Sequence, residues 1–225
     1  MSFSNKWRSH YDQRAEKYGA SAEANDYRDL RQFKILQKIT GKIFRQHNNK
    51  HILDVGCGNG SISKLIAKEN IVYGLDLSLK MLKVAQDKNL IPLSSNALHL
   101  PVGDKTVDST ICFGLLQLFE KSDDVAQCMR ELQRVTKHEG MLILSTIIGE
   151  SLLQRLLCSI FNIKGNHYVE TYSSRKIIQL LEESGFIIEE MYLLYPPLPF
   201  YSKNRNPGIF NRLFASTLVI KALRN

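Results

Sequence analysis

The stretch HILDVGCGNG, residues 51 to 60, constrains the fold more than any other part of the sequence. An apolar run reaches Val55 and is followed at once by glycines at positions 56, 58 and 60. This pattern predicts a buried strand that closes in a tight turn, where the missing Cβ atoms let a ligand approach the backbone. The turn therefore indicates a dinucleotide, a triphosphate or another closely held ligand, or else a tight turn with no ligand.

From residue 52 onward, short apolar runs alternate with amphipathic segments, a pattern typical of strands joined by helices in a parallel sheet. We expect strands near residues 51–55, 71–76, 91–94, 107–113, 140–147, 186–194 and 216–222. We expect helices near residues 4–18, 27–47, 60–69, 78–88, 122–137 and 173–184. The predicted fold class is α/β: a Rossmann-like, seven-stranded, mostly parallel sheet with helices on both faces.

Composition excludes several other classes of protein. The chain is 44% hydrophobic and 23% charged, which is ordinary for a globular domain. Its four cysteines are widely spaced and have no histidines at a zinc-site spacing, so we expect reduced thiols and no metal site. The first residues are polar, and no run approaches the roughly 18 to 20 apolar residues that span a bilayer. We therefore expect no signal peptide and a cytoplasmic location.

The net charge of +8 is unevenly placed along the chain. The segment after residue 195 has no acidic residue and contains Lys203, Arg205, Arg212, Lys221 and Arg224. Such a tail is either a solvated basic face or a surface that meets an anionic substrate, a membrane or RNA.

Two of the candidate ligands fit the glycine turn poorly. The dinucleotide fingerprint G-x-G-x-x-G needs its third glycine where this chain has Ser61, and Asp54 would repel a pyrophosphate. A triphosphate loop needs Lys-Ser or Lys-Thr at a spacing that the chain lacks. An acid beside the turn suits a cofactor with positive charge, such as S-adenosylmethionine with its ammonium and sulfonium groups.

A second acid supports this interpretation. Asp76 ends the second expected strand, 76 − 58 = 18 residues beyond the middle glycine, where a carboxylate can accept hydrogen bonds from both ribose hydroxyls. Nicotinamide enzymes share this feature, so it does not by itself distinguish the two cofactors. Asp76 is alternatively the N-cap of the next helix.

Residues 51 to 147 resemble a class I S-adenosylmethionine-dependent methyltransferase of the group similar to ubiquinone/menaquinone-biosynthesis methyltransferases. The matching stretches are ILDVGCGNG, VYGLDLSLKMLKVAQ, NALHLPVGDKTVDSTICFGLLQLF and ELQRVTKHEGMLILST, in family order and spacing. The resemblance implies S-adenosyl-L-methionine as cofactor and S-adenosyl-L-homocysteine as product. The implied cofactor-binding residues are Asp54, Gly56, Gly58, Gly60, Asp76, Leu77, Met81, Asn96, Ala97 and Phe113, joined with less support by Tyr11 and Tyr18.

Two positions depart from the family pattern. Asn96 stands where relatives often have aspartate facing the adenine amino group, and its amide oxygen can still accept from that group. Gln117 stands where many relatives have histidine, which puts a family-derived general base there in doubt.

The sequence predicts one domain over residues 1–225. Within it we expect a helical cap over 1–48, a cofactor-binding core over 49–148, and substrate-side insertions at 149–172 and 196–213. The first insertion has apolar residues on one helical face, which indicates either a buried helix or a lid over a lipophilic substrate.

Methyl transfer from a sulfonium needs a dedicated base only when the nucleophile must lose a proton. No catalytic residue is therefore compelled, and the candidates are His10, Tyr11, Gln117 and His167. We expect a methyltransferase acting on a small, lipophilic or aromatic metabolite, with no stable nucleic-acid partner and with peripheral membrane contact left open. The alternatives are an RNA or protein methyltransferase, or a non-catalytic cofactor-binding partner of another enzyme.

Overall fold

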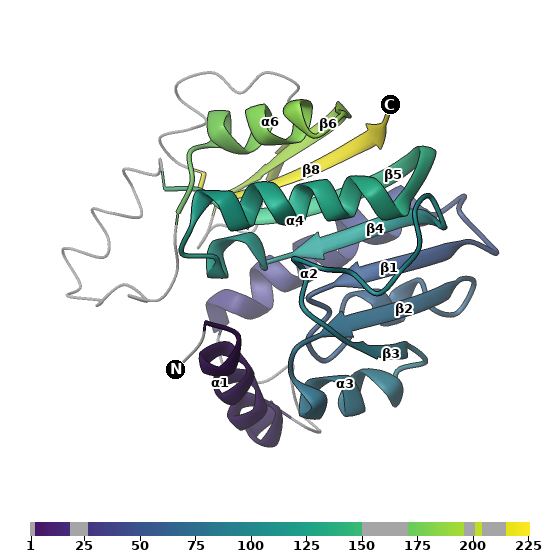
Figure 1. Ribbon diagram of the computed structural model, residues 1–225, viewed down its shortest axis with the longest axis vertical. Coiled ribbons are helices and arrows are strands. Elements are labelled where there is room, and N and C mark those ends of the chain that lie inside the picture. Colours follow the sequence, from purple (N-terminus) through teal and green to yellow (C-terminus); the bar gives the residue numbers. More distant parts are fainter. Residues whose placement is uncertain (1–2, 19–26, 150–170, 196–200, 204–214) are drawn as a thin grey trace.

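All strands that the computed structural model describes form one sheet, in the order β3-β2-β1-β4-β5-β8-β6-β7 (Figure 1). The described residues are 3–18, 27–149, 171–195, 201–203 and 215–225, with side chains over 6–15 in the first helix and from residue 32 in the second. The strands are β1 (His51–Val55), β2 (Ile71–Asp76), β3 (Ile91–Ser94), β4 (Val107–Phe113), β5 (Thr136–Ile147), β6 (Phe186–Leu194), β7 (Tyr201–Lys203) and β8 (Thr217–Arg224). The helices are α1 (Phe3–Tyr18), α2 (Tyr27–Phe44), α3 (Leu79–Gln86), α4 (Ser122–Val135) and α6 (Ser174–Glu183), with 3₁₀ turns η1 (Ser63–Leu65) and η2 (Leu116–Leu118).

The strands from β1 to β5 pair in parallel, whereas β8 runs antiparallel to both β5 and β6. This confirms the predicted α/β class and the mostly parallel sheet. The sheet has eight strands rather than seven, because Tyr201–Lys203 pairs antiparallel with the end of β6. Three residues are too few to show a strand's alternation, so β7 was hidden inside an expected insertion.

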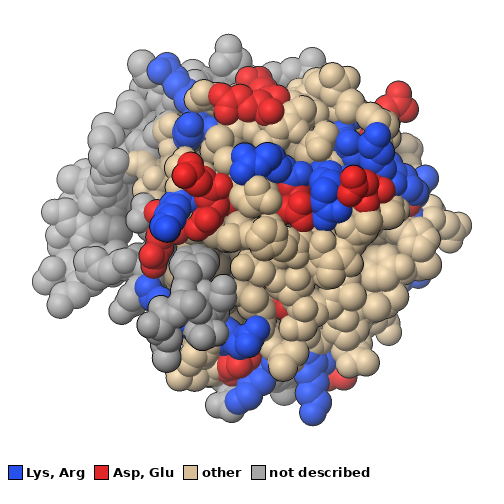
Figure 2. Space-filling view, in the orientation of Figure 1, with Lys and Arg blue, Asp and Glu red and all other residues tan. Residues whose placement is uncertain are grey.

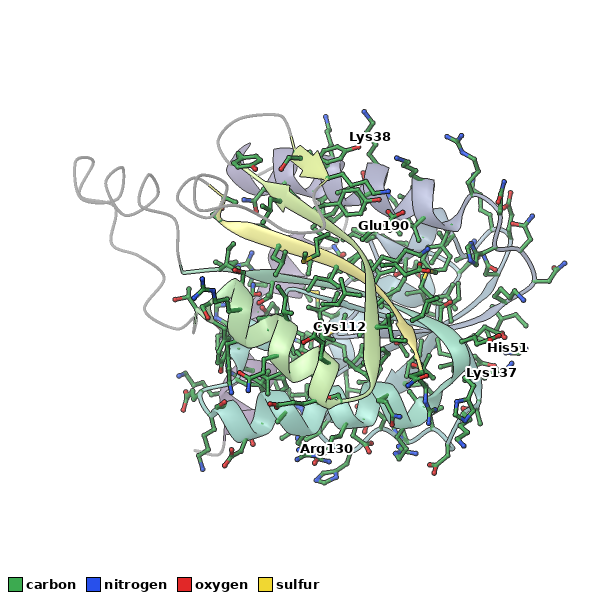
Figure 3. All side chains as sticks on the ribbon, turned by 90° about the horizontal axis from the view of Figure 1, so that it is seen from above. Lys38, His51, Cys112, Arg130, Lys137 and Glu190 are labelled. Atoms are coloured by element: carbon green, nitrogen blue, oxygen red, sulfur yellow. The ribbon has the colours of Figure 1, made fainter. Side chains whose placement is uncertain are left out.

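Alternate residues of the central strands face two separate apolar layers. In β5, Leu142 and Leu144 pack in the layer that includes α4 and α6, while Met141 and Ile143 pack in the layer that includes α2. Viewed from above, α2 and α4 lie on opposite sides of the sheet (Figure 3). Helices therefore cover both faces, as the sequence pattern predicts.

The prediction of a helix over residues 60–69 is wrong. Residues 60–69 form the short η1 and irregular turns instead of an α-helix. Lys64 N donates to the Gly60 carbonyl with α-helical spacing, but Ile66 N donates to the Ser63 carbonyl with 3₁₀ spacing. The Ser63 hydroxyl also donates to the buried Asp54 carboxylate at 2.5 Å, which ties the segment to β1. This long-range bond is invisible to helical periodicity.

The strand ends position the site. Strands β1, β2 and β4 are parallel and end at the same edge of the sheet, and ligands bind at such edges in open α/β sheets. Figure 1 shows α1 beside this edge, next to α3.

Candidate active site

The glycine turn after β1 is held against β2 by its backbone. Gly56 N and Cys57 N both donate to the Leu75 carbonyl, at 2.8 and 3.0 Å. Gly58 has φ +53°, and a Cβ built there would meet no atom within 4 Å. Gly58 lines a cleft, so a side chain at this position would project into open space that a ligand can use.

Asp76 connects this turn to the start of α3. One carboxylate oxygen accepts from Gly58 N at 2.9 Å and the other from Ser78 N at 2.9 Å. Burial raises the pKa of Asp76, while these backbone donors act in the opposite direction. The N-cap of α3 is Ser78, whose hydroxyl accepts from Met81 N, so Asp76 is not the cap. Its carboxylate instead lines the cleft.

The loop after β3 forms the next wall of the cleft. Ser95, Asn96 and Ala97 all line it, and Ser95 N donates to the Asp76 carbonyl at 3.3 Å. The Asn96 side-chain oxygen already accepts from Leu98 N at 3.0 Å. It retains a second lone pair for an adenine amino group.

Helix α1 crosses the mouth of the cleft and contacts both of its sides. On one side Arg8 Nε donates to the Leu77 carbonyl at 3.1 Å, and Asp12 accepts from the Ser78 hydroxyl. On the other side Lys6 pairs with Glu120 at 3.3 Å. These contacts place Trp7 and Tyr11, which lie between them on α1, against the cleft.

The cleft has a volume of about 210 Å³ and brings together residues from five separate segments. The predicted residues among its lining are Tyr11, Gly56, Gly58, Asp76, Leu77, Asn96, Ala97 and Phe113. Gly114, which the family resemblance places beside Phe113 at the methionine moiety, also lines the cleft. The sequence analysis missed Trp7, Leu75, Ser95, Leu115, Leu118 and Phe119. Most of the missed residues are apolar, and an apolar residue beside a strand end gives no sequence signal that separates cleft from core.

Three expected cofactor residues lie behind the cleft lining. Asp54 is buried, and burial raises its pKa to about 7. Gly60 faces Leu90 and Ala85, and Met81 is buried on α3. These residues support the turn and the helix that follow β1 and β2.

The catalytic candidates do not converge. His10 is exposed, lies edge-on to Trp7 and Tyr11, and does not line the cleft. The Gln117 oxygen accepts from Ile147 N and the Thr146 hydroxyl, both at 3.4 Å, which ties η2 to β5. Tyr11 does line the cleft, and burial raises the pKa of its hydroxyl.

The remaining predicted residues lie outside the part of the chain that the structure describes. His167 and most of both expected insertions fall outside the described residues, including the apolar segment 151–161. Tyr18 ends α1, but its side chain is outside the described part.

The basic tail is partly neutralised by the fold. Lys203 pairs with Glu190 at 2.7 Å, Lys221 pairs with Glu189 at 2.6 Å, and Arg224 is buried with its guanidinium on backbone carbonyls. On the face in Figure 2, basic and acidic side chains are interspersed. Among the described residues, the tail is therefore not a continuous basic surface. No described helix is long and apolar enough to cross a membrane, and the described residues contain no cluster that could hold a metal ion.

Comparison with known proteins agrees with this geometry. Residues 53–144 match the family described as "Methyltransferase domain". The demethylmenaquinone methyltransferase of Lactiplantibacillus plantarum is 39% identical over 109 residues, covering 43% of this chain and 44% of the relative. The malonyl-[acyl-carrier protein] O-methyltransferase of Hamiltonella defensa is 36% identical over 123 residues, covering 53% of this chain and 45% of the relative. The chain thus spans about half the length of the curated relatives it matches.

Solved structures share the whole fold. A possible histamine N-methyltransferase from Thermotoga maritima matches with a TM-score of 0.72 at 16% identity, covering 97% of this chain and 99% of that one. The magnesium protoporphyrin IX methyltransferase of Synechocystis PCC 6803, crystallised with S-adenosylhomocysteine, matches with a TM-score of 0.74 at 17% identity, covering 98% and 99%.

Residues 53–144 are therefore a methyltransferase domain with the class I, Rossmann-like fold, and S-adenosylmethionine is the cofactor of this class. The demethylmenaquinone methyltransferases among the chain's relatives confirm the resemblance to the quinone-biosynthesis group. The cleft fits this cofactor, because Gly58 leaves open space at the turn and Asp76 lines the same space.

Proposed function

We propose that this protein transfers the methyl group of S-adenosylmethionine to a small, lipophilic or aromatic acceptor. One observation supports this most directly: a single cleft has a polar end and an apolar end. Gly58, Asp76 and Asn96 lie at or just after the ends of the neighbouring strands β1, β2 and β3, and they form the polar end, which suits the ribose and adenine. The apolar end is formed by Trp7, Phe113, Leu115, Leu118 and Phe119.

The bound cofactor supplies a methyl group on a sulfonium, which is already an activated leaving group. The chain has to align the acceptor with that methyl and keep water away. The apolar side chains at the far end of the cleft exclude water. Trp7 and Tyr11, 6.0 Å apart between ring centroids, both line the cleft and supply aromatic rings that an acceptor can contact.

The pKa of Tyr11 limits which acceptors can react, because it decides whether Tyr11 can remove a proton from the acceptor. Among the described cleft-lining residues, the ionisable side chains are Tyr11 and Asp76. Because burial raises the pKa of Tyr11, its hydroxyl stays protonated near pH 7 and acts as a hydrogen-bond donor rather than a base. We therefore propose an acceptor whose nucleophile is already ionised near neutral pH, such as a carboxylate or an acidic phenol of a quinone-like ring.

Calorimetry followed by a turnover assay tests this function. S-adenosylhomocysteine should bind to the full chain, and labelled methyl groups from S-adenosylmethionine should then appear on lipophilic carboxylates or acidic phenols. Saturated alcohols of the same size are the matched control, because they must lose a proton of much higher pKa. Absence of binding at millimolar cofactor would reject the proposal, binding without turnover would favour a non-catalytic partner, and turnover only on RNA or protein would favour those classes.

A further inference from the structure

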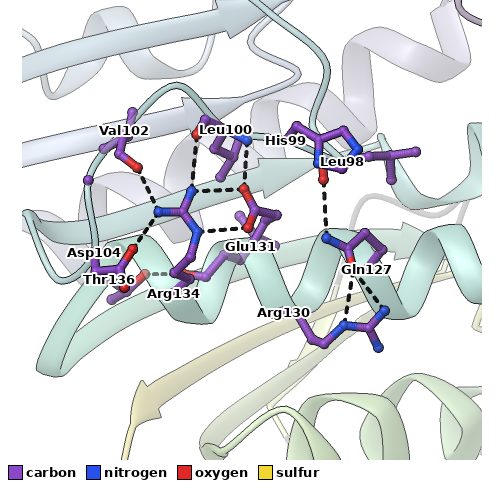
Figure 4. Close-up of polar contacts among 12 residues, drawn as sticks. Leu98, His99, Leu100, Val102, Asp104, Gln127, Arg130, Glu131, Arg134 and Thr136 are labelled. Atoms are coloured by element: carbon purple, nitrogen blue, oxygen red, sulfur yellow. Dashed lines mark hydrogen bonds and ion pairs between the residues drawn. The ribbon is translucent and has the colours of Figure 1, made fainter.

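A polar face of α4 holds the loop that follows β3. Gln127, Glu131 and Arg134 follow one another at four- and three-residue spacing, which places them on one side of the helix. The adjoining side of the helix carries Cys128, Leu132 and Val135, which are fully buried in the core, among other apolar residues. Figure 4 shows the polar residues directed at the loop backbone between Leu98 and Asp104. The apolar residues of α4 therefore pack in the core, while its polar face binds the backbone of this loop.

Arg134 uses every N–H donor that a guanidinium has. Its Nε and one terminal nitrogen bind the Glu131 carboxylate in a bidentate pair, at 2.7 and 2.8 Å. That terminal nitrogen also donates to the Leu100 carbonyl at 3.0 Å. The other terminal nitrogen donates to the Val102 carbonyl at 2.8 Å and to Asp104 at 2.7 Å. A lysine cannot reproduce this planar arrangement.

Glu131 and Gln127 complete the contact nearer the cleft. A Glu131 oxygen accepts from Leu100 N at 2.6 Å, and Gln127 donates to the Leu98 carbonyl at 3.2 Å. Hydrogen bonds from Arg134 are the main cause that lowers the pKa of Glu131, so its carboxylate is ionised at neutral pH. The side chain of Glu131 is only 12% exposed, so solvent screens these contacts weakly.

The same loop forms the polar end of the cleft. Ser95, Asn96 and Ala97 line the cleft, and Leu98 follows at once with its carbonyl on Gln127. The loop has no helix or strand hydrogen bonds over these residues. Its internal bonds run from Leu98 N to the Asn96 side chain, from His99 N to the Asn96 carbonyl and from the Ser95 hydroxyl to the His99 carbonyl. Besides the bond from Ser95 N to the Asp76 carbonyl and the packing of Ala97 in the core, the place of the loop in the cleft is set by what holds residues 98 to 104.

We infer that Gln127, Glu131 and Arg134 are positioning residues that set the affinity for the adenosine half of the cofactor. Held by α4, the loop presents Asn96 and Ala97 at a fixed place opposite Leu77. Without these hydrogen bonds from α4, the loop samples other positions. Ordering the loop then reduces the binding free energy of the cofactor. This inference rests on the assignment of the cleft to S-adenosylmethionine.

The test is Glu131→Ala in the full chain, with Val135→Ala as the control. Both substitutions remove an interaction of α4, but the Val135 side chain is apolar and fully buried, so its loss removes no hydrogen bond to the loop. Dissociation constants for S-adenosylhomocysteine and for adenosine are measured by calorimetry, well below the melting temperatures recorded for each variant. We expect Glu131→Ala to weaken both ligands by the same factor, about tenfold, as for the loss of a charged hydrogen-bond partner. Val135→Ala should lower the melting temperature and leave both constants within about twofold.

Two further variants refine the test. Glu131→Gln keeps an acceptor for Leu100 N and should recover part of the affinity. Gln127→Ala removes one neutral bond to the loop, together with the bonds from Arg130 on the helix surface, and should weaken binding about threefold. It keeps the inference testable should Glu131→Ala fail to fold. In a turnover assay, KM for the methyl donor should rise while kcat stays within about twofold, because the loop lies away from the acceptor end.

Equal affinities in wild type, Glu131→Ala and Gln127→Ala, despite lower melting temperatures, would show that this network only stabilises the fold. A wild-type chain that binds no S-adenosylhomocysteine would overturn the cofactor assignment itself, which separates the two failures.

Discussion

At the polar end of the cleft, backbone atoms and short side chains do the positioning, whereas at the apolar end bulky side chains from separate elements meet. Gly58 and Asp76 are joined by one 2.9 Å hydrogen bond between neighbouring parallel strands. Trp7 and Phe119 reach the cleft from α1 and from the turn before α4. The polar end is thus tied to the sheet and suits a constant ligand, while the apolar end can vary with the acceptor.

The largest expected effect on binding comes from Gly58→Val at the polar end. Valine is strained at φ +53°, and its side chain would enter the cleft. We expect S-adenosylhomocysteine binding to weaken by more than about 100-fold in calorimetry, with the fold retained by circular dichroism. Gly41→Val in α2 is the control, because a Cβ there also meets nothing within 4 Å but Gly41 does not line the cleft. Unchanged binding in Gly58→Val would place the ligand elsewhere.

Asp76→Ala should have the next largest effect. It removes the expected acceptor of the ribose hydroxyls and the bonds to Gly58 N and Ser78 N, for a loss of about 1 to 3 kcal/mol in binding free energy. Asp108→Ala is a matched control at the opposite edge of the sheet, where the carboxylate accepts from His51 N and pairs with Lys137. If Asp76→Ala and Asp108→Ala bind S-adenosylhomocysteine equally well, Asp76 only stabilises the turn and the start of α3.

Trp7→Ala tests the apolar end. Removing the indole should raise KM for a lipophilic acceptor severalfold, through lost apolar contact, and change the dissociation constant of S-adenosylhomocysteine by a smaller factor. Trp7→Phe should restore most of the acceptor affinity. A larger loss of cofactor than of acceptor affinity would mean that α1 serves the polar end.

Asp54 lies behind the residues that line the cleft, so Asp54→Asn should have the smallest effect on ligand binding. Its main effect should be on the stability of the fold. Burial raises the pKa of Asp54 from 3.8 to about 7, so between these pH values the folded chain keeps a proton that the unfolded chain has released. This group therefore makes the free energy of unfolding fall as pH rises through that window, by up to about 1.4 kcal/mol per pH unit. Asp54→Asn should flatten the decline in urea unfolding between pH 4.5 and 7. An unchanged slope would show that Asp54 is ionised throughout.

The sequence predicted the polar end well because its signals are local. The glycine spacing requires a particular backbone path, and an acid at the end of the next strand reaches the same edge in any parallel sheet. The strands from β1 to β4 begin and end where the apolar runs predicted.

Long-range contacts decided what the sequence missed. The bond from Ser63 to Asp54 accompanies irregular turns in place of the expected helix after β1. The pairing of Tyr201–Lys203 with β6 adds an eighth strand. The stretch ELQRV matched the family pattern, yet nothing in its spacing showed that Glu131 and Arg134 grip the loop around Leu100.

By itself the sequence determined the class of fold and the methyl donor, because neighbouring residues set the backbone geometry at a glycine turn and the alternation of strands and helices along the chain. Only the tertiary structure decided that Trp7, Leu118 and Phe119 share one cleft with Asp76, and that α4 holds the loop at its edge. Apolar side chains look alike in sequence whether they fill a core or face a ligand. The packing of distant elements makes that distinction.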